Sequence, residues 1–418
     1  MAVDLFFCIF AVAKILNTSL ILNLTSMKIK KILVTLLSLV IVSVSVLLVS
    51  FDMKPMEGDN HRYYYVFESN GKMGFMDENG REVIAAKYYS LGNFSEGLAS
   101  AKMGDKWGFI DTNGREVVKA RFDGVAHFVD GVSLVWTESW EDDEEVYKYG
   151  YVDKIGKVIR EPQYMEATDF SEGLAAVNVG DYNDPRWGYI DRRGEMVISP
   201  KYTDAGKFSE GLASVESDGK RCYIDKSGKV VLEVKYSVAG FFSEGLAMVG
   251  EYKNRESKLG YIDKSGREVI PLQYAAALPF EGGVASVKTR AGFDVKWEYI
   301  DREGNRIMTF CSGYEAHHRI SEGMMAVKRD GKWGFVDEKG NVAIAPQYKE
   351  VGDFREGLAL VKVDSKYGYI DRTGKMVIAP KYDVAAAFWG PLAWVREGER
   401  AMYIDKKGKT VKEWRAEQ

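Results

Sequence analysis

Cysteine is scarce in this chain, and the three that occur, Cys8, Cys222 and Cys311, lie far apart. They show no C-x-x-C spacing, and one would remain unpaired if the other two were bridged. This argues against a disulfide framework. We therefore expect packing alone to hold the fold.

Proline is also rare, with 9 residues against 42 glycines, while aromatic residues make up 13% of the chain. Such a mixture suits twisted strands and tight turns better than disorder. It favours a β fold.

An excess of positive charge is lacking as well. The formal net charge is -4, and residues 1–51 hold four lysines against the single acid Asp4. The remaining chain therefore has 53 basic and 60 acidic side chains, a formal charge of about -7. Nucleic-acid backbones are held by clustered Lys and Arg, so we expect no nucleic-acid partner.

One long hydrophobic run is present near the amino terminus. Residues 27–51 begin M-K-I-K-K and continue with an uncharged stretch over residues 32–51, long enough for a helix that crosses a bilayer. Two interpretations remain open: a cleaved signal peptide, or an uncleaved anchor whose residues 32–51 span the membrane. In both, the lysines stay in the cytoplasm and the rest is extracytoplasmic, either membrane-anchored or secreted. Residues 1–26 are an uncertain leader, since translation could start at Met1 or Met27, and residues 52–62 form a linker.

The rest of the chain is periodic. An aromatic-aliphatic-Asp tripeptide followed by x-x-Gly recurs ten times, ending at Asp77, Asp111, Asp153, Asp191, Asp225, Asp263, Asp301, Asp337, Asp371 and Asp405. A second anchor, Phe-Ser-Glu-Gly-Leu-Ala or a variant, places Gly at 97, 131, 173, 211, 245, 283, 323 and 357, with Pro391 in the ninth copy. The distance from this anchor to the next Asp is 14, 18 or 22 residues. Even changes of length keep every side chain on its face of a hairpin, so the variable segment is predicted to be a hairpin tip.

The shortest copies predict the strands directly. Asp218-Gly219 separates two alternating runs, which indicates a tight hairpin, and the following Asp-x-x-Gly is a second turn. A third strand follows, such as residues 116–118, and a proline in the link to the next copy should end it. Each copy is thus a three-stranded meander. The aromatic rows of the central strand should pack between copies, because a lone meander is marginal in water.

Two segments carry a family resemblance: Gly104-Asp-Lys-Trp-Gly-Phe-Ile-Asp111 and Gly331-Lys-Trp-Gly-Phe-Val-Asp337. They resemble the WG, or KWG, repeat of bacterial proteins, and the pattern covers residues 63–414, leaving 415–418 as a tail. The resemblance implies a β-rich repeat module, often on exported or envelope proteins, that mediates binding and has no general enzymatic activity. Four copies replace the Trp-Gly pair, with Arg221-Cys222, Leu259-Gly260, Trp297-Glu298 and Ala401-Met402. This argues against a role that needs Trp in every repeat.

For the fold we expect an all-β array of ten three-stranded meanders in an open solenoid or superhelical stack. A closed β-propeller is the alternative. Ten units exceed the usual four to eight blades. The chain also begins and ends with whole meanders instead of splitting one to close a ring.

The recurrent acids do not predict catalysis. The repeated Asp resembles part of a calcium loop, but Lys or Arg often follows it, so a turn role is favoured. Glu96, Glu172, Glu210 and Glu244 could each supply a glycosidase carboxylate, yet near-identical copies do not make one specialised site. The histidines His61, His127, His317 and His318 show no ligand or triad spacing. We expect no catalytic residue, metal site or cofactor.

One segment, residues 137–147, departs from the repeat at the longest hairpin tip. It contains Trp140, Glu141, Asp142, Asp143, Glu144 and Glu145. These could dock a basic partner with Trp140 as an apolar anchor, or form a solvated tip. For the whole chain we expect a non-catalytic envelope scaffold that binds a protein or a cell-wall polymer. A purely structural spacer and a hydrolase with an unrecognised site are the alternatives.

Overall fold

A computed structural model describes residues 63–141, 144–253, 256–291, 294–309, 314, 316–317 and 320–415. The chain divides into two units, Met1–Lys54 and Pro55–Gln418, and every described residue belongs to the second. The expected leader 1–26, the apolar segment 27–51, the linker 52–62 and most of the tail lie outside the described residues. Across the described ranges, no helix has the length and hydropathy needed to cross a bilayer.

The described residues form ten antiparallel sheets, each made of strands consecutive in the chain. We call them blades 1 to 10 in chain order. Blades 1 to 5 contain β1 (Tyr65–Ser69), β2 (Lys72–Met76), β3 (Glu82–Tyr88); β4 (Ser90–Ser95), β5 (Leu98–Met103), β6 (Lys106–Asp111), β7 (Glu116–Phe122); β8 (Gly124–Val125), β9 (Val132–Glu141), β10 (Glu144–Asp153), β11 (Val158–Tyr164); β12 (Glu166–Ala167), β13 (Leu174–Asn178), β14 (Trp187–Asp191), β15 (Met196–Tyr202); and β16 (Asp204–Ala205), β17 (Leu212–Ser217), β18 (Lys220–Asp225), β19 (Val230–Glu233). Blades 6 to 10 contain β20 (Val238–Ser243), β21 (Leu246–Lys253), β22 (Glu256–Asp263), β23 (Glu268–Tyr274); β24 (Ala276–Ala277), β25 (Ala285–Ala291), β26 (Asp294–Ile300), β27 (Arg306–Thr309); β28 (Ala316–His317), β29 (Met324–Arg329), β30 (Lys332–Asp337), β31 (Val342–Tyr348); β32 (Glu350–Val351), β33 (Leu358–Val363), β34 (Lys366–Asp371), β35 (Met376–Tyr382); and β36 (Val384–Ala385), β37 (Leu392–Glu397), β38 (Arg400–Asp405), β39 (Thr410–Arg415).

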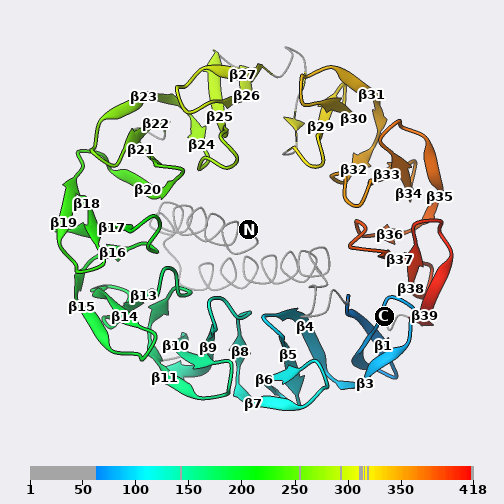
Figure 1. Ribbon diagram of the computed structural model, residues 1–418, viewed down its shortest axis with the longest axis horizontal. Helices are drawn as coiled ribbons and strands as arrows, with labels where there is room; N and C mark the ends of the chain where they lie inside the picture. Colours follow the sequence, from blue (N-terminus) through cyan, green and yellow to red (C-terminus); the bar gives the residue numbers. More distant parts are fainter. Residues whose placement is uncertain are drawn as a thin grey trace, which may run out of the picture. The chain divides into compact units, whose positions relative to one another are not determined.

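The blades follow one another around a closed ring, with the first strand of each full blade innermost and the last on the rim (Figure 1). This is a ten-bladed β-propeller. The all-β prediction is confirmed, but the preferred open solenoid is wrong and the closed propeller is right. Blade number alone did not exclude closure, because the ring closes by side-chain packing and needs no split meander.

The blades also have one more strand than expected. Nine of the ten sheets have four strands, and only blade 1 has three among the described residues. The extra strand is a short inner one, such as β16, which pairs with β17 through Asp204 and Ala205. The third predicted strand is longer than expected as well, because β15 runs through Pro200. Proline is tolerated there since β15 is an edge strand, whose outward N–H groups have no ladder partner.

The glycine of the Trp-Gly pair sets the shape of the outer strand. In blade 2, Trp107 faces Phe122 and Phe109 faces Val118, so two extra residues of β7 bulge over Gly108. A Cβ on Gly108 would lie 2.3 Å from the carbonyl oxygen of Val118, which no side chain tolerates. Where the glycine is replaced by Cys222, Glu298 or Met402, the outer strand pairs with that position residue by residue.

Aromatic pairs join neighbouring blades, as predicted from the central strand. The Tyr or Phe two residues before the Asp packs on the Phe of the next blade's inner segment, with ring centroids 4.6 to 5.1 Å apart. The pairs are Phe75 and Phe94, Phe109 and Phe128, Tyr151 and Phe170, Tyr189 and Phe208, Tyr223 and Phe242, Tyr261 and Phe280, Phe335 and Phe354, and Tyr369 and Phe388. Each pair contributes about 0.5–1.5 kcal/mol beyond its buried area. The core is therefore a series of interfaces between blades.

Blade 10 closes on blade 1 by a variant of the same contact. The rings of Tyr403 and Tyr65 lie 5.2 Å apart, and the Tyr65 hydroxyl donates to the carbonyl oxygen of Trp389 at 2.9 Å. On the rim, Lys412 of β39 pairs with Glu82 of β3 at 3.2 Å. Side chains from both ends of the array thus form one buried cluster.

Candidate functional site

The Ser-Glu-Gly turn joins the inner strand of a blade to its second strand. Its two central residues both have positive φ, for example 51° at Glu96 and 84° at Gly97. This is the signature of a two-residue type I′ turn, which normally takes Asn or Gly at the first position. Glutamate in this conformation costs about 1–3 kcal/mol, so its side chain must supply a compensating interaction.

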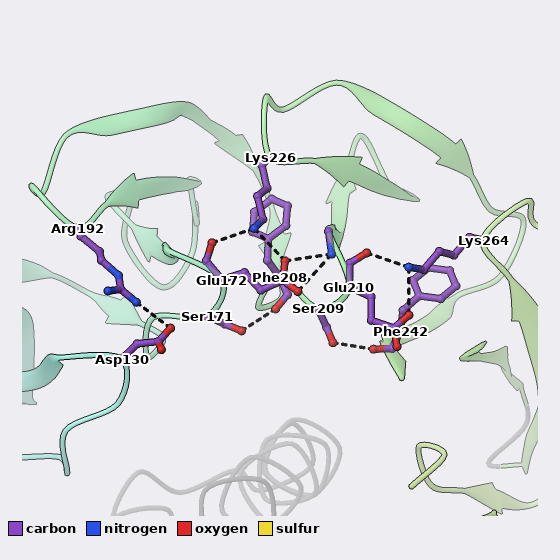
Figure 2. Close-up of polar contacts among 11 residues, drawn as sticks. Asp130, Ser171, Glu172, Arg192, Phe208, Ser209, Glu210, Lys226, Phe242 and Lys264 are labelled. Atoms are coloured by element: carbon purple, nitrogen blue, oxygen red, sulfur yellow. Dashed lines mark hydrogen bonds and ion pairs between the residues drawn. The ribbon is translucent and has the colours of Figure 1, made fainter. Parts of the chain in front are cut away.

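That interaction is a ladder of contacts with the next blade (Figure 2). The carboxylate of Glu172 accepts a hydrogen bond from the Gly211 N–H at 3.0 Å and lies 3.1 Å from the Lys226 ammonium. The neighbouring Ser171 hydroxyl donates to the carbonyl oxygen of Phe208 at 2.7 Å. Burial on its own would raise the pKa of Glu172, but the hydrogen bonds from Lys226 and Gly211 outweigh it and hold the pKa below its usual value. The set recurs at the next interface with Ser209, Glu210 and Lys264.

Both the acid and the base vary along this ladder. Asp130, shorter than Glu, meets Arg192, longer than Lys, at 3.0 Å. In blade 7 the acid is replaced by Gly282, and in blade 8 the position of the base is taken by Glu338. In blade 10 the acid is replaced by Gly390, and blade 1 has Glu78 at the matching position. A base is thus absent from both of these interfaces, where the acid is absent too, which identifies the ladder as an ion-pair device between blades.

The repeated Asp has the turn role predicted for it. In all ten copies one carboxylate oxygen accepts hydrogen bonds from the backbone N–H groups two and four residues later, at 2.7 to 3.1 Å. At Asp371 the Thr373 hydroxyl, followed by the Thr373 and Lys375 N–H groups, lowers the pKa. These carboxylates are used for structure.

The ring therefore has two different faces. The Ser-Glu-Gly and Asp-x-x-Gly turns lie together on one, since Lys226 of an Asp turn reaches Glu172 of a Ser-Glu-Gly turn; we call it the turn face. The hairpin tips between the second and third strands, with the links between blades, lie on the other, the tip face. There Asp383 of a link accepts from the Gly398 N–H of a hairpin tip at 2.8 Å. The tip face holds the variable lengths and four well-exposed aromatic side chains, Trp140, Tyr89, Tyr182 and Tyr252, which are 69%, 58%, 57% and 53% exposed.

The blade 3 hairpin, β9 and β10, is the longest of the tip face. Glu145 lies opposite Trp140, Tyr147 opposite Glu138, and Tyr149 opposite Trp136. Directly opposed residues share a face of a hairpin, and alternate residues along a strand do too. These six side chains therefore form one aromatic and acidic surface, which we call the blade 3 patch. A hydrogen bond with the Glu145 carboxyl raises the pKa of Glu138.

The tip of blade 4 adds a further aromatic residue beside this patch. Burial raises the pKa of Tyr149 to about 12, with added effects of the nearby Tyr182 and Glu166. The tip loop that carries Tyr182 is held by the buried Asn178, whose side-chain oxygen accepts from the N–H groups of Gly180 and Arg186 at 2.9 Å. Tyr182 is thus presented from a braced loop.

The structure places the predicted docking residues on the tip face. Trp140 is strongly exposed. Glu141, the last residue of β9, pairs with Glu144, the first residue of β10, and Glu145 is exposed on the blade 3 patch. Asp142 and Asp143 lie outside the described residues. Sequence reasoning missed Trp136, Glu138, Tyr147, Tyr149 and Tyr182. The alternation of Trp136, Glu138 and Trp140 along one strand was the signal that could have found the first two.

A separate hollow of about 600 Å³ lies at the closure between blades 1 and 10. Phe67, Glu399, Lys412, Trp414 and Arg415 are among the residues that line it. Two of its bases are already paired, Lys412 with Glu82 at 3.2 Å and Arg415 with Glu399 at 2.7 Å. We therefore assign this hollow to ring closure.

Comparison with known proteins supports the fold and names a family. A crystal structure of a eukaryotic initiation factor has a similar fold, with a TM-score of 0.51, 10% identity, and coverage of 85% of this chain and 96% of that one. Kluyveromyces lactis Hsv2 (TM-score 0.33, 10% identity, 69% and 96% coverage) and the tricorn protease (0.26, 11%, 76% and 38%) are more distant matches. No curated protein matches the sequence significantly.

The model of a family described as "WG containing repeat" matches residues 73–107, 107–135, 149–182, 187–220, 223–251, 260–290, 333–367 and 367–400. Together these segments cover more than half of the chain, and they fall on the strands and turns described above. The chain belongs to the WG-repeat family.

Proposed function

We propose that this protein is a non-catalytic scaffold whose tip face binds a macromolecular partner of the cell envelope, a protein or a cell-wall polymer. The observation that carries the proposal is the contrast between the two faces. On the turn face the recurrent acids are engaged within the fold, in Asp turns and in the ladder. On the tip face the hairpins vary in length and expose Trp140, Tyr182 and Tyr252. Exposed aromatic side chains on a rigid frame are typical anchors of binding surfaces.

The contacts of the recurrent acids also argue against a catalytic role for them. A catalytic carboxylate must be free to exchange protons or attack substrate. The repeated Asp residues accept two backbone hydrogen bonds each, and ladder glutamates such as Glu172 are held by a backbone N–H and a lysine. We also propose that the ring works outside the cytoplasm, anchored through residues 32–51 or secreted. That location follows from the apolar run and its basic flank.

The test compares retention of the full-length protein by purified peptidoglycan and by solubilised envelope proteins. The tip-face variant combines Trp140→Ala, Tyr182→Ala and Tyr252→Ala. The matched control is Ile155→Ala, which removes an apolar side chain that is 81% exposed in an Asp turn of the turn face. We expect the tip-face variant to lose retention and the control to keep it. Retention unchanged in the tip-face variant, or no retention of the folded wild-type protein by either material, would refute the proposal and favour a spacer.

A further inference from the structure

The blade 3 patch brings aromatic rings and the two carboxylates of Glu138 and Glu145 together on one face of a single hairpin. Trp136 and Tyr149 form its inner part, with ring centroids 6.2 Å apart, and Trp136 packs over Gly124 of the inner strand. Trp140 lies further out along the same face of the hairpin, where it is 69% exposed. The aromatic rings thus extend from the body of the blade to the hairpin tip.

The charges on and around the patch are mostly negative. Glu138 and Glu145 lie close enough for their carboxyl groups to share a hydrogen bond, and Asp123 is near Glu138. Lys106 is the basic residue near Glu138, but it already forms an ion pair with Asp123. On the side of blade 4, Glu166 lies near Tyr149 and Tyr182. When both carboxyl groups are ionised they repel each other, and a cation that binds between them would relieve this repulsion.

The patch is also held in place on both sides. Its hairpin is paired without interruption from Val132 and Asp153 to Glu141 and Glu144. Across from it, the loop of Tyr182 is closed by Asn178 and by Asp181, whose carboxylate accepts from the Asn183 and Asp184 N–H groups at 2.8 and 2.7 Å. A preorganised surface loses little conformational entropy when it binds.

We infer that the blade 3 patch, with Tyr182 of blade 4, binds an extended lysine-rich or arginine-rich segment of a partner protein. The inference rests on the proposed function and names the class of partner for it. The rings of Trp140 and Tyr182 cover the alkyl stems and attract the cationic groups, while Glu138 and Glu145 pair with those groups. Charge complementarity favours a basic peptide. A neutral glycan has no cationic group to pair with the carboxylates, and an anionic wall polymer is repelled by them.

The probe is a short, fluorescently labelled peptide of alternating lysine and alanine, titrated with the full-length protein at low and high salt. A matched peptide with glutamate in place of lysine tests the charge. We expect the lysine peptide to bind and to weaken as salt rises, and the glutamate peptide not to bind. Glu138→Gln combined with Glu145→Gln, and separately Trp140→Ala, should each weaken binding by about tenfold or more.

The control is Ile155→Ala with Glu303→Gln, which removes an exposed apolar side chain and an exposed carboxylate from Asp turns of the turn face. Thermal unfolding of all variants confirms that the ring is intact, because these exposed changes leave the core untouched. Equal losses in the control and in the patch variants would overturn the inference, as would binding of a neutral oligosaccharide through Trp140 without binding of the lysine peptide. If the peptide does not bind while tip-face aromatics are still needed for retention by envelope material, the partner class is wrong and the proposed function stands.

Discussion

The carboxylate of Asp130 and the guanidinium of Arg192 lie 3.0 Å apart across the interface of blades 3 and 4, where the next interfaces pair Glu with Lys. Asp130 is shorter than Glu and Arg192 is longer than Lys, so the distance between the charged groups is nearly the same as at the next interfaces. Together with the joint loss of acid and base between blades 7 and 8, this pair indicates that the unit of the ladder is the interface, shared by two blades.

Reversal of one pair should test the ladder. Glu172→Lys alone and Lys226→Glu alone each place like charges together, and Glu172→Lys also removes the acceptor of the Gly211 N–H. Each should lower the free energy of unfolding by about 1 kcal/mol. The double exchange should recover part of the loss, because attraction is restored while the contact with Gly211 is not. Denaturant titration measures the three variants. A double variant as unstable as the sum of both singles would show that the pair is not coupled.

Gly108→Ala should be strongly destabilising. The new Cβ would meet the Val118 carbonyl oxygen at 2.3 Å, so the outer strand must shift, at a cost of about 1–3 kcal/mol. Gly206→Ala is the control, since its Cβ would lie 3.4 Å from the nearest atom, the Ser214 carbonyl oxygen, and should change the melting temperature little. Equal effects of the two substitutions would contradict the bulge as the reason for the glycine.

The Asp turns should make stability sensitive to acid. The folded-state pKa of Asp371 is lowered from 3.8, so its charged form is favoured by folding. The stabilisation is complete above the unfolded-state pKa and disappears as the pH falls through the lower folded-state pKa. We expect Asp371→Asn to be less stable than the wild type at neutral pH and the difference to shrink as the pH falls below about 4. Melting curves at several pH values measure it, and a difference independent of pH would argue against this role.

Ring closure should depend on Tyr65. Tyr65→Ala removes both the packing on Tyr403 and the hydrogen bond to Trp389, and should cost about 3–5 kcal/mol at that interface. Tyr65→Phe removes only the hydrogen bond and should cost about 1 kcal/mol. Hydrogen exchange should become faster in blades 1 and 10 first. Faster exchange spread evenly over all blades, or none, would indicate that closure does not depend on this contact.

Local features of this fold were predictable from sequence, and long-range ones were not. The Asp turns, the hairpin tips and the aromatic contacts between copies follow from spacing and alternation over a few residues. Closure depends on the angle between successive blades. This angle arises from side-chain packing at every interface and cannot be derived from the sequence of a single repeat. The inner strands escaped prediction because two residues, as in Asp204 and Ala205, show no alternation. The strand through Pro200 was cut short because its position on the edge was unknown.

The candidate site was predictable only in part. Trp140 and the acids that follow it stood out because they break the repeat. Tyr182 did not stand out, because it lies in blade 4 and Tyr149 in blade 3. The two residues are close only when these blades are packed side by side in the ring. The joint replacement at Gly282 and Glu338 was visible in the sequence, but it has meaning only once the two positions are known to face each other.

Each blade consists of strands consecutive in the chain, and among the described residues no sheet joins the two ends of the array. The position of the chain break around the circle is therefore arbitrary. Circular permutants cut at other links between blades should fold to the same ring. The gain or loss of a whole repeat would leave the strand order of every other sheet unchanged.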